Sequence, residues 1–107
     1  MPDTTPEELV AVAEVGPVQE VLQAIADPVR LEMVRRLAAA PDLTVRCSAL
    51  YDDIGKSTAS HHFKVLRESG LTERLSIEGQ PHQRLRLSAV GERYPGLLDT
   101  VIQALDD

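Results

Sequence analysis

The spacing of apolar residues changes at Gly70, and this change restricts the fold more than any other feature of the sequence. Before Gly70, residues 56–69 (KSTASHHFKVLRES) place Ala59, Phe63 and Leu66 on one face of a helix. After it, apolar and polar residues alternate, which is typical of a β-strand. A glycine at this point favours a left-handed turn that ends the helix, with the next residue folding back onto it. The sequence therefore predicts a helix followed directly by a strand.

Residues 72–88 predict a two-stranded hairpin, which we call the wing. The apolar positions of its alternating pattern are Leu75, Ile77, Leu85 and Leu87. Gly79-Gln80-Pro81 between the two halves predicts the turn. Because an isolated hairpin is barely stable in water, its apolar face is expected to pack against the helices.

Three helices are predicted before residue 42. Thr5-Pro6-Glu7-Glu8 has the residues of a capped helix start, so the segment 1–16 is expected to hold an acidic helix that ends near Val15. A second helix begins at Pro17, and Asp27 caps a third.

The remaining segments complete the predicted fold. Residues 42–54 (DLTVRCSALYDDI) mix apolar and acidic positions, so we expect one or two irregular turns, with a short helix as the alternative. A last helix covers 95–105. The predicted fold class is mainly α, with about five helices and a two-stranded wing, in a single domain over 1–107.

Net charge at first argues against a nucleic-acid partner, because the chain carries a formal charge of −6. The charge is unevenly distributed: residues 1–27 hold acids and no Lys or Arg, whereas residues 56–93 hold seven Lys and Arg against four acids. Affinity for nucleic acid depends on the local surface that meets phosphate, so an acidic total does not exclude DNA.

The adjacent histidines His61 and His62 lie 100° apart on the predicted helix, so they do not share a face. Paired metal ligands on a helix are spaced three or four residues apart, which makes this pair a poor metal site. His61 is expected to face outward and His62 to pack at the edge of the core. The outward residues, together with two wing arginines, form the predicted DNA-binding set: Lys56, Ser57, Thr58, Ser60, His61, Lys64, Arg84 and Arg86.

A short helix, a tight turn, a second helix with a polar outward face and a basic hairpin follow the order of a winged helix-turn-helix. Two stretches, ADPVRLEMVRRL (26–37) and KSTASHHFKVLRESGL (56–71), resemble the ArsR/SmtB group of bacterial winged-helix transcriptional regulators. The resemblance implies a cytoplasmic homodimer that binds double-stranded operator DNA, usually as a repressor released by a metal or another signal. It places the helix-turn-helix at 42–70 and the dimer interface on the first and last helices. The apolar residues expected in that interface are Leu97, Leu98, Val101, Ile102 and Leu105.

The sequence departs from this group at two places. Ser48 and Asp52 stand where the first helix of the helix-turn-helix usually carries leucine, so that helix is expected to be short or displaced. The paired cysteines and the C-terminal histidines of the group's sensing sites have no counterpart, so no cofactor or metal is predicted there. A regulatory metal at a non-standard site remains an alternative, with Cys47, His61, His62, His82 and the N-terminal carboxylates as the available ligands. A redox response of Cys47 also stays open.

Other functional classes are less compatible with the sequence. An enzyme would need Cys47 paired with His61 or His62, and His61 is expected to face away from the core, so no enzymatic activity is predicted. A winged helix that binds a protein partner is the main alternative, but the outward face is neither apolar nor acidic. No apolar run approaches the roughly 18 residues of a membrane helix, and the lone cysteine suits a reducing cytoplasm.

Overall fold

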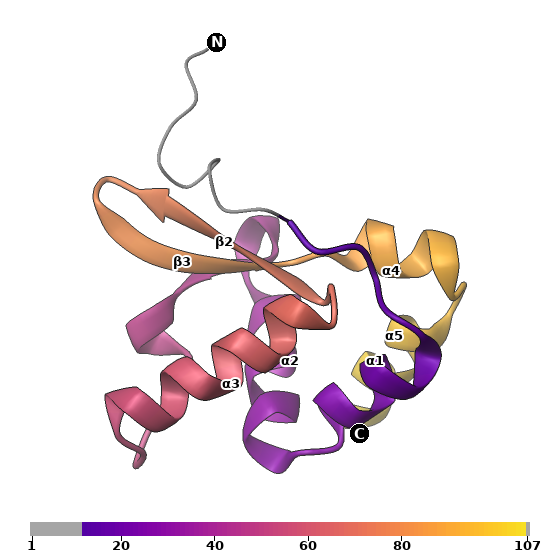
Figure 1. Ribbon diagram of the computed structural model, residues 1–107, viewed down its shortest axis with the longest axis horizontal. Helices are drawn as coiled ribbons and strands as arrows, with labels where there is room; N and C mark the ends of the chain where they lie inside the picture. Colours follow the sequence, from indigo (N-terminus) through magenta and orange to yellow (C-terminus); the bar gives the residue numbers. More distant parts are fainter. Residues whose placement is uncertain (1–11, 107) are drawn as a thin grey trace, which may run out of the picture.

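The computed structural model describes residues 12–106, which form five α-helices and a small three-stranded sheet (Figure 1). The predicted acidic helix of segment 1–16 falls largely on residues outside this range. Its last part does not: residues 12–17 are not helical, so the expected helix end near Val15 is wrong. This segment, which we call the strap, instead runs extended across the domain (Figure 1).

The next two helices confirm the prediction. Helix α1 covers Val18–Ile25 and α2 covers Pro28–Ala39. Asp27 Oδ1 accepts hydrogen bonds from the backbone N–H groups of Val29 (2.8 Å) and Arg30 (3.1 Å). This cap satisfies two amides that have no partner inside the helix, and the proline at the first position fixes the backbone angle that the helix requires.

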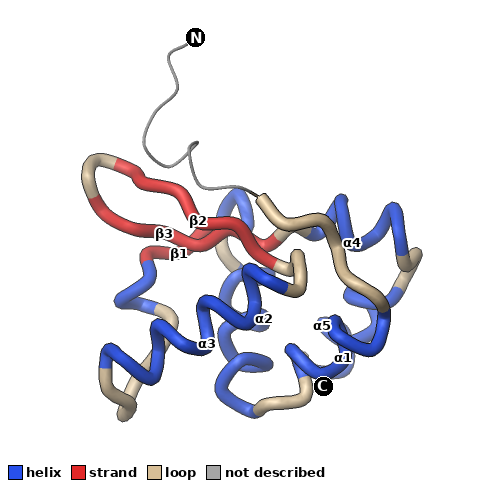
Figure 2. Tube along the Cα trace, in the orientation of Figure 1, coloured by secondary structure: helices blue, strands red, loops and turns tan. Residues whose placement is uncertain are grey.

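A third strand occupies part of the segment expected to be irregular. Strand β1 (Thr44–Arg46) lies between the 3₁₀ turns Pro41–Leu43 and Cys47–Ala49, and it pairs antiparallel with the second wing strand. The sheet order is therefore β1-β3-β2, with β3 in the centre (Figure 2). A strand of three residues is too short for alternation to reveal it, which explains why the prediction of irregular turns missed it.

Helix α3 (Lys56–Glu68) ends as predicted at Gly70. Gly70 has φ of 86°, its N–H donates to the Arg67 carbonyl (3.0 Å), and the Leu71 N–H reaches back to the Leu66 carbonyl (3.1 Å). These two bonds are the Schellman arrangement, which satisfies carbonyls that the helix would otherwise leave unpaired.

The wing consists of β2 (Thr72–Ile77) and β3 (Gln80–Leu85). Its two-residue turn is Glu78-Gly79, with φ of 53° and 79°, one step earlier than predicted. Two positive φ angles match the right-handed twist of the flanking strands, so this turn fits a hairpin better than the proline at 81 would.

The wing is also shorter than the predicted 72–88. Helix α4 (Leu87–Arg93) begins directly after it, where the sequence predicted more strand, and α5 (Leu97–Leu105) follows Gly96. Helix α4 was missed because Leu85 and Leu87 continue the two-residue spacing of the strand before the helical pattern becomes visible.

The core is aliphatic and joins all the elements. Its largest fully buried side chains include Met33, Leu37, Leu66, Leu71 and Leu85. Leu98 of α5, predicted to lie in the dimer interface, is only 2% exposed and belongs to this core. That expectation is corrected: a terminal helix must first pack on its own domain, and Leu98 makes this contact.

The strap is held by side chains from distant parts of the chain. Arg86 donates to the carbonyls of Ala13 and Gly70, Arg93 to that of Val15, and the Tyr94 hydroxyl to that of Gly16 (2.8 Å). The Gly16 N–H in turn donates to the Ser69 carbonyl (2.9 Å). The strap therefore connects α4 with the C-terminal end of α3.

Candidate nucleic-acid interface

The outward face of α3 is as polar as the sequence indicated. Its exposed residues are Lys56, Ser57, Thr58, Ser60, His61, Lys64 and Glu68. Lys64 is near Glu68, with Nζ 4.0 Å from a carboxylate oxygen, an exposed pair of little energetic weight. The short hydroxyl and imidazole groups remain available to hydrogen-bond a partner along the first two turns of the helix.

The two histidines occupy the different positions that the sequence predicted. His61 is exposed, whereas His62 is buried, with 8% of its surface accessible. Nδ1 of His62 lies 3.0 Å from Arg30 Nη1, and Arg30 Nε also donates to the Ala24 carbonyl (2.6 Å). A guanidinium only donates hydrogen bonds, so Nδ1 of His62 is the acceptor in this contact. His62 thereby ties α3 to the junction of α1 and α2.

His62→Ala is expected to lower the free energy of unfolding by about 1–2 kcal/mol, because it removes a buried ring and leaves Arg30 without this acceptor. His61→Ala should change it by less than about 0.5 kcal/mol, since the side chain is exposed. Urea denaturation of the two variants measures both values. A stable His62→Ala chain beside a destabilised His61→Ala chain would contradict the placement of the pair.

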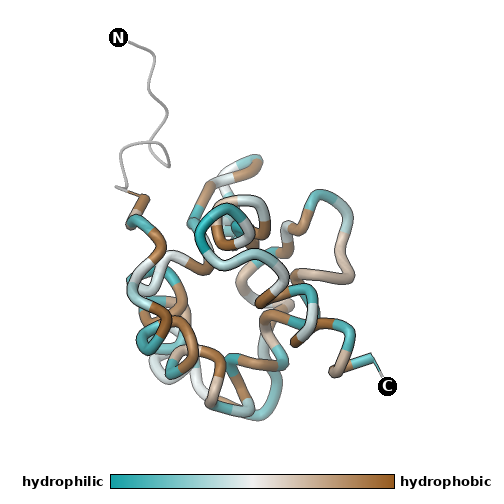
Figure 3. The backbone as a smooth tube through the Cα atoms, turned by 90° about the vertical axis from the view of Figure 1, so that its right-hand side faces the viewer, coloured by the Kyte–Doolittle hydropathy of each residue, from teal (hydrophilic) through white to brown (hydrophobic). Residues whose placement is uncertain are grey.

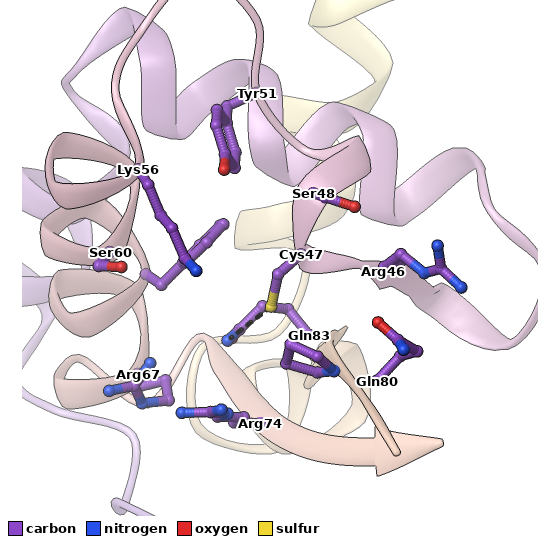
Figure 4. A pocket seen from close by; sticks show the side chains of 12 residues that line it. Arg46, Cys47, Ser48, Tyr51, Lys56, Ser60, Arg67, Arg74, Gln80 and Gln83 are labelled. Atoms are coloured by element: carbon purple, nitrogen blue, oxygen red, sulfur yellow. Dashed lines mark hydrogen bonds between the residues drawn. The ribbon is translucent and has the colours of Figure 1, made fainter. Parts of the chain in front are cut away.

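A cavity of about 420 Å³ separates α3 from the wing (Figure 4). Its lining comes from three parts of the chain: residues 46–51 at the end of β1 and just after it, one side of α3, and both wing strands. The residues that line it are Arg46, Cys47, Ser48, Tyr51, Lys56, Ser60, Phe63, Arg67, Arg74, Gln80, Pro81 and Gln83. No Asp or Glu is among them.

The cations of this cavity are unlike the others in the chain. Seven of the eleven Lys and Arg residues form hydrogen bonds or ion pairs through their side chains, among them Arg30, Arg35 and Arg84. The other four make no such contact within residues 12–106, and all four line the cavity: Arg46, Lys56, Arg67 and Arg74. The cavity therefore brings together the cationic side chains that form no hydrogen bond or ion pair within residues 12–106.

Figure 4 shows how these side chains lie. Lys56 extends towards the middle of the cavity, and Arg67 and Arg74 lie side by side at one end, from α3 and β2. Arg46 is at the rim, with its guanidinium directed away from the middle. An anion entering the cavity would thus meet three cationic groups, with a fourth at the edge.

Cys47 lies at the base of the cavity, where Gln83 Nε2 donates to its Sγ over 3.8 Å. Gln83 is itself buried, and its Oε1 accepts from the Thr72 hydroxyl (3.0 Å). Burial raises the pKa of the Cys47 thiol, although the hydrogen bond from Gln83 and the charges of Arg74 and Arg67 act in the opposite direction. A thiol with a raised pKa is mostly protonated at neutral pH and is a poor nucleophile.

Three comparisons relate this structure to known proteins. A family model described as a helix-turn-helix domain matches residues 25–74, from the end of α1 into β2. The HTH-type transcriptional regulator YceK of Bacillus subtilis (strain 168) is 32% identical over 84 residues, which cover 77% of this chain and 83% of YceK. The chain is an ArsR-like helix-turn-helix transcriptional regulator.

Solved structures agree with this assignment of the regulator. The crystal structure of the transcriptional repressor BigR from Xylella fastidiosa is 28% identical, with a TM-score of 0.56 over 72% of this chain and 85% of BigR. An ArsR family transcriptional regulator is 20% identical, with a TM-score of 0.62 over 82% of this chain and 88% of its own, and shares the fold. The relatives are regulators of transcription, a class without enzymatic activity.

The two wing arginines of the regulator do not lie as predicted. Arg86 lies just after β3, and its side chain donates hydrogen bonds to the carbonyls of Ala13 in the strap and of Gly70. The expectation that it projects from the wing is wrong. Arg84 lies in β3, but Nε donates to Glu73 (3.0 Å) and Nη1 is 3.7 Å from Asp42. Its charge is largely matched inside the fold.

Sequence reasoning did not place Arg46, Arg67 and Arg74 beside α3, where they line the cavity. One signal in α3 pointed to Arg67: Lys56, Ser60, Phe63 and Arg67 follow the spacing of a single helical stripe between the core and the outward face. Arg46 and Arg74 reach the cavity through tertiary structure, since β1 and β2 bring them to it from either side of β3. No local pattern reveals that placement.

The available metal ligands do not meet in the part of the regulator that the structure describes. Between residues 12 and 106, no three His, Cys, Asp or Glu side chains are grouped as a metal ion would require. His82 lies in the wing, where Nδ1 is 2.9 Å from the Gln80 carbonyl. No helix in the same range is long and apolar enough to cross a membrane.

Proposed function

We propose that this regulator is a cytoplasmic repressor that binds operator DNA as a homodimer, through α3 and the cavity beside it. The observation that carries the proposal is that the four cations free of contacts within residues 12–106 all gather next to the exposed polar face of α3. A DNA duplex presents both matching features, base edges in the major groove and a row of phosphates beside it.

In the proposed complex, α3 enters the major groove. Ser57, Ser60 and His61 have the hydrogen-bonding groups and the exposure to meet base edges. Lys56 stands at the N-terminus of α3, where the helix dipole also favours phosphate. One DNA strand would follow the cavity between α3 and the wing, with its phosphates neutralised by Lys56, Arg67 and Arg74.

Apolar surface on the first and last described helices supports dimerisation. Val18 and Leu22 of α1 are 43% and 45% exposed, although both are large apolar residues. Val101, Ile102 and Leu105 of α5 are only partly buried. Figure 3 views the molecule from the side on which α1, α4 and α5 lie, and apolar residues recur along its helical turns. A second copy of the chain would cover this surface, and two copies would present two α3 helices to successive turns of DNA.

Leu22→Glu combined with Ile102→Glu is expected to give a folded monomer, because it places charge on the apolar surface without replacing a fully buried residue. Sedimentation velocity at micromolar concentration measures the oligomeric state of the variant and of the wild type. Ser88→Glu, at an exposed position of α4, is the control and should leave the dimer intact. A wild-type chain that sediments as a monomer would overturn the homodimer.

The DNA-binding proposal is tested by titrating fluorescent duplex of random sequence with the full chain at several salt concentrations. Three cavity cations in each of two protomers predict a slope of log K against log[salt] of about −5. Affinity that does not depend on salt would favour a protein partner instead. We further propose that binding needs no metal ion, so a chelator added to the same titration should leave the affinity unchanged.

A further inference from the structure

The cavity contains more than a row of phosphates requires. Its inner wall is aromatic: Tyr51 and Phe63 form an edge-to-face pair with ring centroids 6.1 Å apart. The chain has one Phe, two Tyr and no Trp, so two of its three aromatic side chains line this one cavity. Cys47 and Pro81 add further surface of low polarity. The phosphates of a DNA strand that follows the cavity would contact its cations and would not use this apolar interior.

The charge of the cavity is one-sided as well. Lys56, Arg67 and Arg74 face it, and its lining contains no carboxylate that would compensate them. Arg67 and Arg74 also lie close enough to Cys47 for their charges to lower its pKa, against the larger effect of burial. The cationic groups and the aromatic wall therefore belong to the same small space.

We propose that this cavity binds a small organic anion, with a phosphate or carboxylate group on a planar apolar body, and that its binding releases DNA. The anionic group would be held by Lys56, Arg67 and Arg74, and the apolar body would rest on Tyr51 and Phe63. A volume of about 420 Å³ lies within the range of pockets that enclose small ligands.

Competition with DNA follows from shared groups and rests on the proposed function. The cations that would neutralise the DNA strand are the same ones that would bind the ligand, so both cannot be fully satisfied at once. A ligand that occupies the cavity therefore weakens operator binding without a change of fold. The binding of the ligand itself does not depend on this step and is measured without DNA.

Isothermal titration calorimetry of the full chain in a phosphate-free buffer at low salt tests the site with three probes. Phenyl phosphate offers both the charge and the ring, inorganic phosphate offers only the charge, and phenol offers only the ring. Phenyl phosphate is expected to bind once per chain and at least about tenfold more tightly than either partial probe, because it alone satisfies both walls. Equal affinity for phenyl phosphate and inorganic phosphate would overturn the proposal.

Two arginine variants decide where the probe binds. Arg74→Gln should weaken phenyl phosphate binding by about tenfold or more, since a charge-assisted hydrogen bond is lost. Arg35→Gln removes the same charge from α2, where Arg35 pairs with Glu32 and does not line the cavity, and should leave the affinity unchanged. Circular dichroism confirms that both variants fold. Equal weakening in both variants would overturn the assigned site.

Fluorescence anisotropy with labelled duplex then separates the two proposals. Phenyl phosphate should raise the apparent Kd for DNA in proportion to its own occupancy of the cavity, and phenol should not. A probe that saturates the cavity while the affinity for DNA stays constant would overturn the competition. A chain that binds phenyl phosphate but no duplex would support the ligand site and overturn the proposed function.

Discussion

Replacing Arg67 and Arg74 together by glutamine is expected to reduce the affinity for duplex DNA by about 10- to 100-fold at 0.1 M salt. Both guanidiniums face the cavity and make no ion pair within residues 12–106, so they are available to phosphate. The proposed dimer would lose four such cations, which should make the salt slope shallower by about 3 to 4 units. Glutamine keeps most of the side-chain volume, so the stability of the fold should change little.

The matched control is the double variant Arg35→Gln with Arg84→Gln, which removes the same charge from residues paired with acids. It should lower the affinity for DNA by no more than a few-fold. Fluorescence anisotropy titrations of both variants over a range of salt give affinity and slope together. If the two double variants lost affinity equally, total charge would govern binding and the cavity would have no special part in it.

Gly70→Ala is expected to destabilise the domain by about 2–5 kcal/mol, for two separate reasons. Its φ of 86° is unfavourable for any residue with a Cβ atom. The new Cβ would also lie 2.5 Å from the Cα of Val15 and 2.6 Å from the Glu14 carbonyl oxygen, both backbone atoms of the strap. Helix α3 and the strap would have to move apart to admit it.

Two other glycines separate these reasons. Gly79 has φ of 79°, but a Cβ atom added there would have nothing within 4 Å, so Gly79→Ala should cost only the backbone penalty of about 1–2 kcal/mol. Gly91 is in α4 at ordinary φ with open space around it, so Gly91→Ala should stabilise the chain by about 0.5–1 kcal/mol. Urea denaturation ranks all three. Equal losses in the free energy of unfolding for Gly70→Ala and Gly79→Ala would show that the strap moves away from the new Cβ atom at little energetic cost.

The sequence predicted the elements whose signals are local. Helix α3, its stop at Gly70 and the exposure of His61 beside a buried His62 all follow from helical spacing, and each is confirmed. The alternation of apolar and polar residues predicts the two wing strands. The predicted end of the wing lies too far along the chain, because Leu87 continues the two-residue spacing of β3 although it belongs to α4. The local sequence pattern predicts an element correctly where that element is determined by residues close together in the chain.

What could not be predicted depends on segments far apart in the chain. Strand β1 is recognisable only beside β3, since three residues carry no period of their own. Arg46 and Arg74 become neighbours of α3 through sheet pairing, and Arg86 was misplaced because its acceptors are the carbonyls of Ala13 and Gly70. Leu98 was assigned to an interface because a sequence cannot show which side of an apolar helix its own core will take.

The strap also bears on where the cooperative folding unit ends. Residues 25–74 carry the helix-turn-helix match, but that stretch lacks β3, the central strand of the sheet, as well as Val15 and Leu98 of the core. The C-terminal end of α3 is held by the strap, which lies more than fifty residues earlier in the chain. Arg86 and Arg93, which follow the wing in the sequence, hold the strap in turn through its backbone carbonyls. We therefore expect that an excised segment 25–74 would not fold independently, because the orientation of α3 depends on contacts from residues outside that segment.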